Sequence, residues 1–272
     1  MNFNYDALPA ATAKLWRALE HDHLLAGFVL IGGTALALHI GHRKSEDLDL
    51  VWTGQRLPRA RIEQWITRLK SEGFEPMRVQ NIADEEDFLN SGLELLDFQQ
   101  NFVAGPVKVS LFTPEEELRE VLKDVEKSKV GPTVAPLDKI FATKCLVSAH
   151  RNKSRDWLDL YVLCTTCGYG VEGIYQTFEK YEKYGWDSAI NRLTRMERTP
   201  DDEGYEHMMD DPPTLDEMRK FFQDGRATLE RALARSRAAM APAPAQDRAG
   251  VAIEPQAGPE PDDDEPHKGH SR

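Results

Sequence analysis

Two aspartates, Asp47 and Asp49, flank a single leucine at the start of a short apolar segment. In a β-strand alternate side chains point to the same face, so the two carboxylates would lie about 7 Å apart along the strand. Their charges repel each other, and a bound cation would offset that repulsion. Mg²⁺ typically takes one or two protein carboxylates together with the phosphates of a substrate. The pair therefore predicts a metal site, although an isolated Asp-x-Asp is also common at a solvated strand end.

A glycine pair, Gly32 and Gly33, lies upstream of these acids, directly after an apolar run. Glycine pairs mark tight turns, and Thr34 stands where an N-cap residue would open the next helix. The main-chain N–H groups at such a turn and the dipole of the helix favour an anion. A phosphate-binding turn upstream of a metal-binding acid pair is the combination that phosphoryl or nucleotidyl transfer requires.

A basic segment between residues 139 and 155 stands out in a chain of formal net charge -12. Lys144 and Arg151 are seven residues apart and so share one helical face. They could supply the counter-charge that a triphosphate or an RNA backbone needs. The alternative is a solvated connection between two helices, in which Asp156 and Asp159 pair at the surface with the neighbouring lysine and arginine. Arg43, in the loop before Asp47, likewise either contacts phosphates or belongs to a solvated loop.

The elements that would position these residues follow from apolar spacing and turn residues. We expect strands over residues 27–33, 47–52, 93–102 and 107–112, the last two as a hairpin. We expect helices over residues 9–25, 34–40, 58–72, 136–153, 154–167, 173–184 and 214–239. This order predicts a mixed α/β domain over residues 1–132 and a helical domain over residues 133–240. Residues 241–272 are acidic and rich in proline, and we expect them to form a disordered tail.

Composition excludes several classes of protein. The net charge excludes a generally basic protein that coats nucleic acid. No stretch of about 18 apolar residues is present, so we expect no contact with a membrane. The N-terminus lacks the basic-then-apolar layout of a signal peptide, and three cysteines do not make a disulfide framework. We expect a cytoplasmic protein.

Three segments together resemble one known family. The segment GGTALALHIGHRKSEDLDL is similar to the first signature of the AbiEii/AbiGii toxin family of nucleotidyltransferases. The segment KCLVSAHRNKSRDWLDLY resembles the second block of that family, and MMDDPPTLDEMRKFF resembles its C-terminal block. The resemblance implies an α+β fold, in which a polymerase-β-like nucleotidyltransferase domain with a small mixed sheet precedes a helical C-terminal part. It also implies the toxin of a toxin–antitoxin or phage-defence pair, with the antitoxin encoded nearby.

The resemblance implies the activity as well. A nucleoside monophosphate would pass from GTP, CTP or ATP to an acceptor, with the 3′ end of tRNA or another RNA as the leading candidate. The cofactor would be Mg²⁺, with Mn²⁺ as the alternative. The implied catalytic residues are Asp47, Asp49, Lys144 and Asp156, of which Asp47 and Asp49 hold the metal and Lys144 holds the triphosphate. The implied nucleotide-binding residues are Gly32, Gly33, Thr34, Arg43, Ser45 and Arg151.

One element of the family pattern is missing. The third metal carboxylate usually comes from a strand after the Asp-x-Asp strand, but Ser110 occupies the best-placed position here. Asp97, on the partner strand of the hairpin, is the other candidate. This gap leaves two alternatives open. One is a nucleotide-binding or antitoxin-binding module with weakened catalysis, and the other is an adenylyltransferase that modifies a small molecule.

Overall fold

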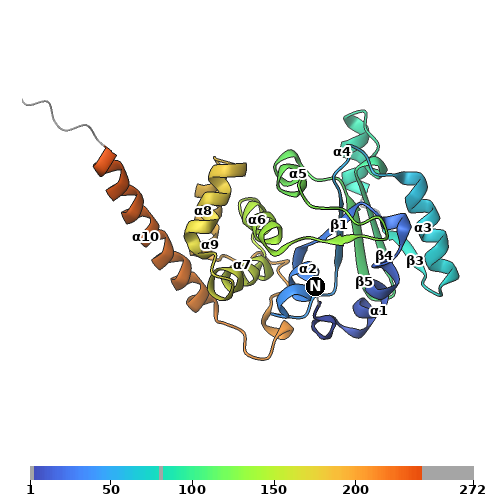
Figure 1. Cartoon of the computed structure of the whole chain (residues 1–272), viewed down its shortest axis with the longest axis horizontal. Helices are drawn as coiled ribbons and strands as arrows, with labels where there is room; N and C mark the ends of the chain where they lie inside the picture. Colours follow the sequence, from blue (N-terminus) through green and yellow to red (C-terminus); the bar gives the residue numbers. More distant parts are fainter. Residues whose placement is uncertain (1–2, 80–81, 241–272) are drawn as a thin grey trace, which may run out of the picture. The chain divides into compact units, whose positions relative to one another are not determined.

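A computed structural model describes residues 3–79 and 82–240 and shows a mixed sheet flanked by helices (Figure 1). The described residues up to Leu233 form one compact unit. The strands are β1 (Phe28–Ile31), β2 (Leu48–Trp52), β3 (Pro76–Val79), β4 (Gln99–Ala104), β5 (Val107–Phe112) and β6 (Thr133–Val134). The helices are α1 (Ala10–Leu19), α2 (Gly32–Ile40), α3 (Arg59–Ser71), α4 (Ile82–Asn90), α5 (Glu116–Leu122), α6 (Leu137–Ser148), α7 (Ser154–Thr166), α8 (Gly170–Tyr181), α9 (Trp186–Arg195) and α10 (Leu215–Met240). Short 3₁₀ helices cover Tyr5–Ala7, His23–Leu25, Leu95–Asp97 and Glu206–Met208.

The six strands lie in the order β3-β4-β5-β2-β1-β6. Strand β2 is antiparallel to β1 and parallel to β5, and the hairpin strands β4 and β5 are antiparallel. Strand β2 therefore lies inside the sheet, where both of its edges are hydrogen-bonded and its position is fixed. This is the strand that follows Asp47 and contains Asp49.

The pleat of the sheet gives its two faces different characters. On one face Phe102, Val109 and Leu48 are neighbours in register and all are buried. Trp65 of α3 covers this face, with its ring 5.4 Å from that of Phe102. The next register row, on the opposite face, contains Asn101, Ser110 and Asp49. Apolar side chains therefore pack on one face of the sheet, and the row that contains Asp49 on the opposite face is polar.

The helical part of the chain is built around α6. This helix contacts α2 on the side of the sheet and α5, α7, α8 and α9 in the helical part. Residues Ile140 to Leu146 are all buried, and they include Lys144. A lysine in the middle of a buried helix needs carboxylate partners, because an unpaired buried charge is strongly destabilising.

The α+β fold with a mixed sheet is confirmed, as is the hairpin around Gly105. The predicted strand over residues 93–102 is wrong in its first half, because Arg56 and Arg59 bind Asp97 in a 3₁₀ turn. Thr34 is not an N-cap, since α2 already begins at Gly32. The division at residue 132 stays a prediction, and the predicted disordered tail over residues 241–272 lies outside the described residues. Among the described residues, no helix is long and apolar enough to span a membrane.

Candidate active site

The chain passes from β1 into α2 without a loop, and Gly32 makes this possible. Gly32 has φ of +77°, a left-handed conformation that side chains other than glycine rarely adopt. A Cβ atom at Gly32 would lie 2.6 Å from the carboxylate oxygen Oδ2 of Asp49. At Gly33, a Cβ atom would lie 2.5 Å from Nη2 of Arg43. The glycine pair therefore brings the first turn of α2 against both charged side chains.

We expect Gly32→Ala to lose both activity and stability. The added methyl group would strain the backbone and also displace Asp49. The nucleotidyl transfer that the sequence predicts should therefore fall by about a hundredfold or more, since a small misplacement at the reacting centre can cost that much. Gly73→Ala is a matched control, because Gly73 has φ of +82° but nothing lies within 4 Å of its Cβ position. Urea denaturation should show a loss of stability in both variants, because both have a positive φ, while activity should fall only in Gly32→Ala. Equal activity in the two variants would contradict the close contact with Asp49.

Thr34 and Ser45 tie helix α2 to the segment that precedes β2. The Thr34 hydroxyl lies 3.0 Å from the Ser45 hydroxyl and also hydrogen-bonds the main-chain oxygen of Asp47. Both side chains are buried. Their observed contacts fix the position of Asp47, and their predicted contact with a nucleotide stays a prediction.

Asp49 is an acid of this region whose carboxyl has a raised pKa. It is paired in register with Ile31 of β1 and Ser110 of β5. Burial and the neighbouring charge of Asp47 raise the pKa of the Asp49 carboxyl, and the positive charges of Lys144 and Arg151 offset only part of this effect. A carboxylate in this position favours an additional cation.

The structure places the two candidates for a third carboxylate differently. Ser110 is the register neighbour of Asp49, on the same face of the sheet, as the sequence predicted. Asp97 instead lies before the first residue of β4, where Arg56 and Arg59 bind it at 2.8 and 3.3 Å. Asp97 is therefore not a partner of Asp49. Within residues 3–79 and 82–240, no three His, Cys, Asp or Glu side chains gather closely enough to hold a metal ion by themselves.

A pocket of about 230 Å³ unites the two sequence blocks. Eight of the ten predicted site residues line it, and Lys153 and Arg155 complete the lining. The eight are Gly33, Arg43, Ser45, Asp47, Asp49, Lys144, Arg151 and Asp156. The other two, Gly32 and Thr34, are packed behind the pocket against Asp49 and Ser45. We refer to this cavity as the catalytic pocket.

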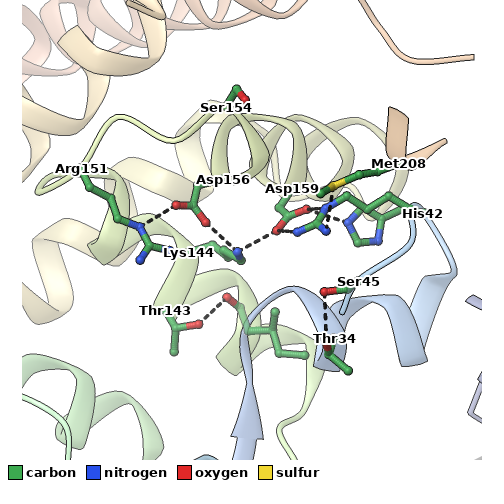
Figure 2. Close-up of polar contacts among 12 residues, drawn as sticks. Thr34, His42, Ser45, Thr143, Lys144, Arg151, Ser154, Asp156, Asp159 and Met208 are labelled. Atoms are coloured by element: carbon green, nitrogen blue, oxygen red, sulfur yellow. Dashed lines mark hydrogen bonds and ion pairs between the residues drawn. The ribbon is translucent and has the colours of Figure 1, made fainter. Parts of the chain in front are cut away.

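Two buried aspartates of α7 hold the cations of the pocket (Figure 2). Nζ of Lys144 lies 2.7 Å from Asp156 and 2.7 Å from Asp159. Arg151 donates through Nε to the other carboxylate oxygen of Asp156 at 2.8 Å. Burial alone would raise the pKa of Asp156, but Lys144 and Arg151 outweigh it and lower that pKa. Asp156 is thus an ionised anchor for two cations, and this makes it a poor proton acceptor.

Asp159 is the residue that sequence reasoning missed. It is fully buried and does not pair with the surface cations; instead Arg43 donates to its two oxygens at 2.7 and 2.9 Å. His42 Nε2 lies 2.7 Å from the same carboxylate. Its spacing in the sequence could have indicated this role, because Asp156 and Asp159 are three residues apart and therefore lie on the same face of a helix. The predicted contact of Arg43 with a nucleotide stays a prediction.

The cations at the mouth of the pocket have partners in an acidic loop. Lys153 pairs with Asp201, and Arg155 pairs with Glu203. Between them, the main-chain N–H of Ser154 donates to Asp202 at 3.2 Å. The segment 201–203 thus lies across the start of α7 and neutralises two of the five positive charges that line the pocket.

The geometry combines an anion site with a pair of acids. The N-terminus of α2, Lys144 and Arg151 favour negative charge, whereas Asp47 and Asp49 favour positive charge, and all face one small cavity. A polyphosphate together with a divalent cation satisfies both requirements. The arrangement therefore suits chemistry at a phosphate group.

The family comparison agrees with this geometry. The model of the nucleotidyl transferase AbiEii toxin family, of type IV toxin–antitoxin systems, matches residues 14–249. The chain therefore belongs to the AbiEii nucleotidyltransferase toxin family. Membership makes the protein a nucleotidyltransferase of the toxin class, with a nucleoside triphosphate as substrate and an antitoxin as its counterpart.

Solved structures that are similar to the chain include one from Helicobacter pylori and one from Mycobacterium tuberculosis. JHP933 from Helicobacter pylori is 18% identical, with a TM-score of 0.44 and coverage of 88% of this chain and 99% of that one. MenT4, a nucleotidyltransferase toxin from Mycobacterium tuberculosis H37Rv, is 15% identical, with a TM-score of 0.37 and coverage of 81% and 86%. Comparison with curated proteins finds no match.

Proposed function

We propose that the protein is a metal-dependent toxin of the cytoplasm that transfers a nucleoside monophosphate from an NTP to RNA, with the 3′ end of tRNA as the leading acceptor. The observation that carries this proposal is the catalytic pocket. It joins Asp47 and Asp49 to Lys144 and Arg151, from two blocks about a hundred residues apart in sequence.

Asp47 and Asp49 fit a divalent cation. They are hard oxygen ligands of like charge, and burial and the charge of Asp47 raise the pKa of the Asp49 carboxyl despite the nearby Lys144 and Arg151. We expect Mg²⁺ or Mn²⁺ to be held by these two carboxylates together with substrate phosphates. When bound, the ion supplies positive charge that offsets the charge of the phosphates during transfer.

The side chains around the acids bind and orient the NTP. The main-chain N–H groups at Gly33 and the ammonium group of Lys144 attract the phosphates. Arg151 adds charge at the edge of the pocket; its Nε is bound to Asp156, and no other described residue accepts a hydrogen bond from its guanidinium. Positioning and electrostatic stabilisation account for most of the rate gain in phosphoryl transfer.

The charge at the mouth of the pocket favours RNA over a cationic small molecule. Lys153 and Arg155 line the pocket beside Arg151. An RNA phosphate can take the place of Asp201 and Glu203 on Lys153 and Arg155, whereas a cationic acceptor cannot bind these side chains.

Transfer can be tested directly with labelled substrates. The wild-type protein is incubated with Mg²⁺, total tRNA and each α-labelled NTP in turn, beside Asp49→Ala and Asp97→Ala variants. We expect label in RNA with the wild type and Asp97→Ala, and none above background with Asp49→Ala. Asp97 is a matched control because its carboxylate is bound to Arg56 and Arg59, outside the pocket.

Two outcomes of this assay would contradict the proposal. Label in RNA that is equal in the wild type and in Asp49→Ala would exclude Asp49 as an essential acid. Label that appears on the protein and never on RNA would replace the RNA acceptor with a protein one.

A further inference from the structure

A second, larger cavity adjoins the catalytic pocket, and the proposed function so far leaves it without a role. Its volume is about 800 Å³, within the range of ligand pockets. Three half-buried phenylalanines line it: Phe88 of α4, Phe98 just before β4, and Phe112 of β5. The ring centroids of Phe88 and Phe98 are 5.5 Å apart. We refer to it as the aromatic cleft.

The aromatic cleft lies on the same face of the sheet as Asp49. Ser110 is the register neighbour of Asp49, and Phe112 follows two residues later on β5, so its side chain points to that face. Arg151 lines both cavities. A ligand with phosphates in the catalytic pocket can therefore extend past Arg151 into the cleft.

The chemistry of the aromatic cleft differs from that of the catalytic pocket. Phenylalanine faces stack on nucleobases, and amides recognise base edges. Gln55 and Gln99 both line the cleft, and within the described residues no protein group hydrogen-bonds their side-chain amides. These amides are thus available to a ligand.

The charges of the cleft disfavour a phosphate there. Glu115, Glu116 and Glu117 are exposed on its rim. Arg119, a further cation of the lining, donates to the main-chain oxygens of Thr53, Gly54 and Pro114. Phosphates are attracted to the catalytic pocket and repelled at the rim, whereas an uncharged aromatic ring suits the cleft.

We propose that the aromatic cleft binds a nucleobase, by stacking on Phe98 and Phe112 and by hydrogen bonds to Gln99. This inference rests on the proposed function, since it assigns the phosphates next to that base to the catalytic pocket. The base belongs either to the NTP or to the terminal nucleotide of the acceptor. The two sources share one chemistry, and binding measurements separate them.

Calorimetric titration tests the proposal without any turnover. Each of the four NTPs, tripolyphosphate and the trinucleotide CCA are titrated with Mg²⁺ into the wild type, Phe98→Leu and Phe112→Leu. Loss of a stacking face should weaken binding of the base-containing ligand about tenfold. Tripolyphosphate binding should stay within about twofold, because it lacks a base. A loss for NTPs assigns the cleft to the donor base, and a loss for CCA alone assigns it to the acceptor.

Two further variants control for packing. Phe112→Tyr keeps the aromatic face and should retain wild-type affinity, whereas Phe112→Leu should not. Phe74→Leu removes a part-buried ring outside the cleft and should leave every affinity unchanged. The proposal is overturned if NTP and CCA affinities are unchanged in both leucine variants of the cleft, or if tripolyphosphate binding falls as far as NTP binding. A chain that fails to transfer label but shows these binding changes would overturn the proposed function alone.

Discussion

Replacing Asp49 with asparagine is expected to abolish nucleotidyl transfer while making the metal-free protein more stable at neutral pH. Transfer should fall about a thousandfold, since in the proposed function Asp49 is one of two acids that hold the metal, and its loss would remove several kcal/mol of charge stabilisation. The gain in stability follows from the raised pKa of Asp49, which reflects burial and the charge of Asp47. An amide at that position removes the repulsion and keeps the shape.

The effect of Asp49 on the free energy of unfolding should depend on pH in one direction. The folded pKa of Asp49 lies above the unfolded value of about 3.9, so the stability contributed by this group is complete below about pH 4 and is lost as the pH rises through the folded pKa. Urea denaturation with EDTA should therefore show curves for the wild type and Asp49→Asn that converge near pH 4 and separate at pH 7. If the wild type is more stable than Asp49→Asn at pH 7, the environment assigned to Asp49 is wrong.

Removal of Asp159 is expected to have the largest effect on stability. Asp159→Ala would leave Arg43 with no carboxylate partner and Lys144 with only Asp156, and all of these side chains are buried. Breaking a buried ion pair in this way typically costs about 3–5 kcal/mol. Chemical denaturation measures the loss. Asp201→Asn is the control, because it removes a carboxylate from an exposed ion pair, where little change is expected.

The loss of stability at acid pH provides a second test of the role of Asp159. Burial alone would raise the pKa of Asp159, but Arg43 and Lys144 outweigh it and hold that pKa well below its usual range. The stabilisation is thus present above the unfolded pKa of about 3.9 and is lost as the pH falls through the folded pKa. The stability difference between the wild type and Asp159→Asn should stay constant from pH 5 to pH 8 and shrink below pH 4. A constant difference down to pH 2 would argue against an ionised Asp159.

The residues of the catalytic pocket could be predicted from the sequence more readily than the strands and helices around it. Asp47, Asp49 and Gly33 are close in sequence, and their spacing alone placed them at the start of one strand and at one turn. Strand β6 has only two residues, and β3 has four and begins with a proline, so neither is long enough for its sequence pattern to predict a strand. Both were therefore missed.

The role of Asp159 could not be predicted for a different reason. Its pairing with Arg43 joins residues 116 positions apart, and nothing local in either segment specifies it. Spacing showed that Asp159 shares a face with Asp156, but whether that face meets solvent or protein depends on how α7 packs. The alternative of surface pairing for both acids was wrong, because α7 turns this face toward α6 and the loop of Arg43.

The acidic segment at residues 201–203 has a consequence for how the protein responds to salt. Binding of a phosphate by Lys153 or Arg155 is an exchange reaction, in which Asp201 or Glu203 leaves and becomes hydrated. The freed carboxylates take up cations from solution and cancel part of the counterion release that drives RNA binding. RNA affinity should therefore fall less steeply with ionic strength than the number of basic side chains in the catalytic pocket implies.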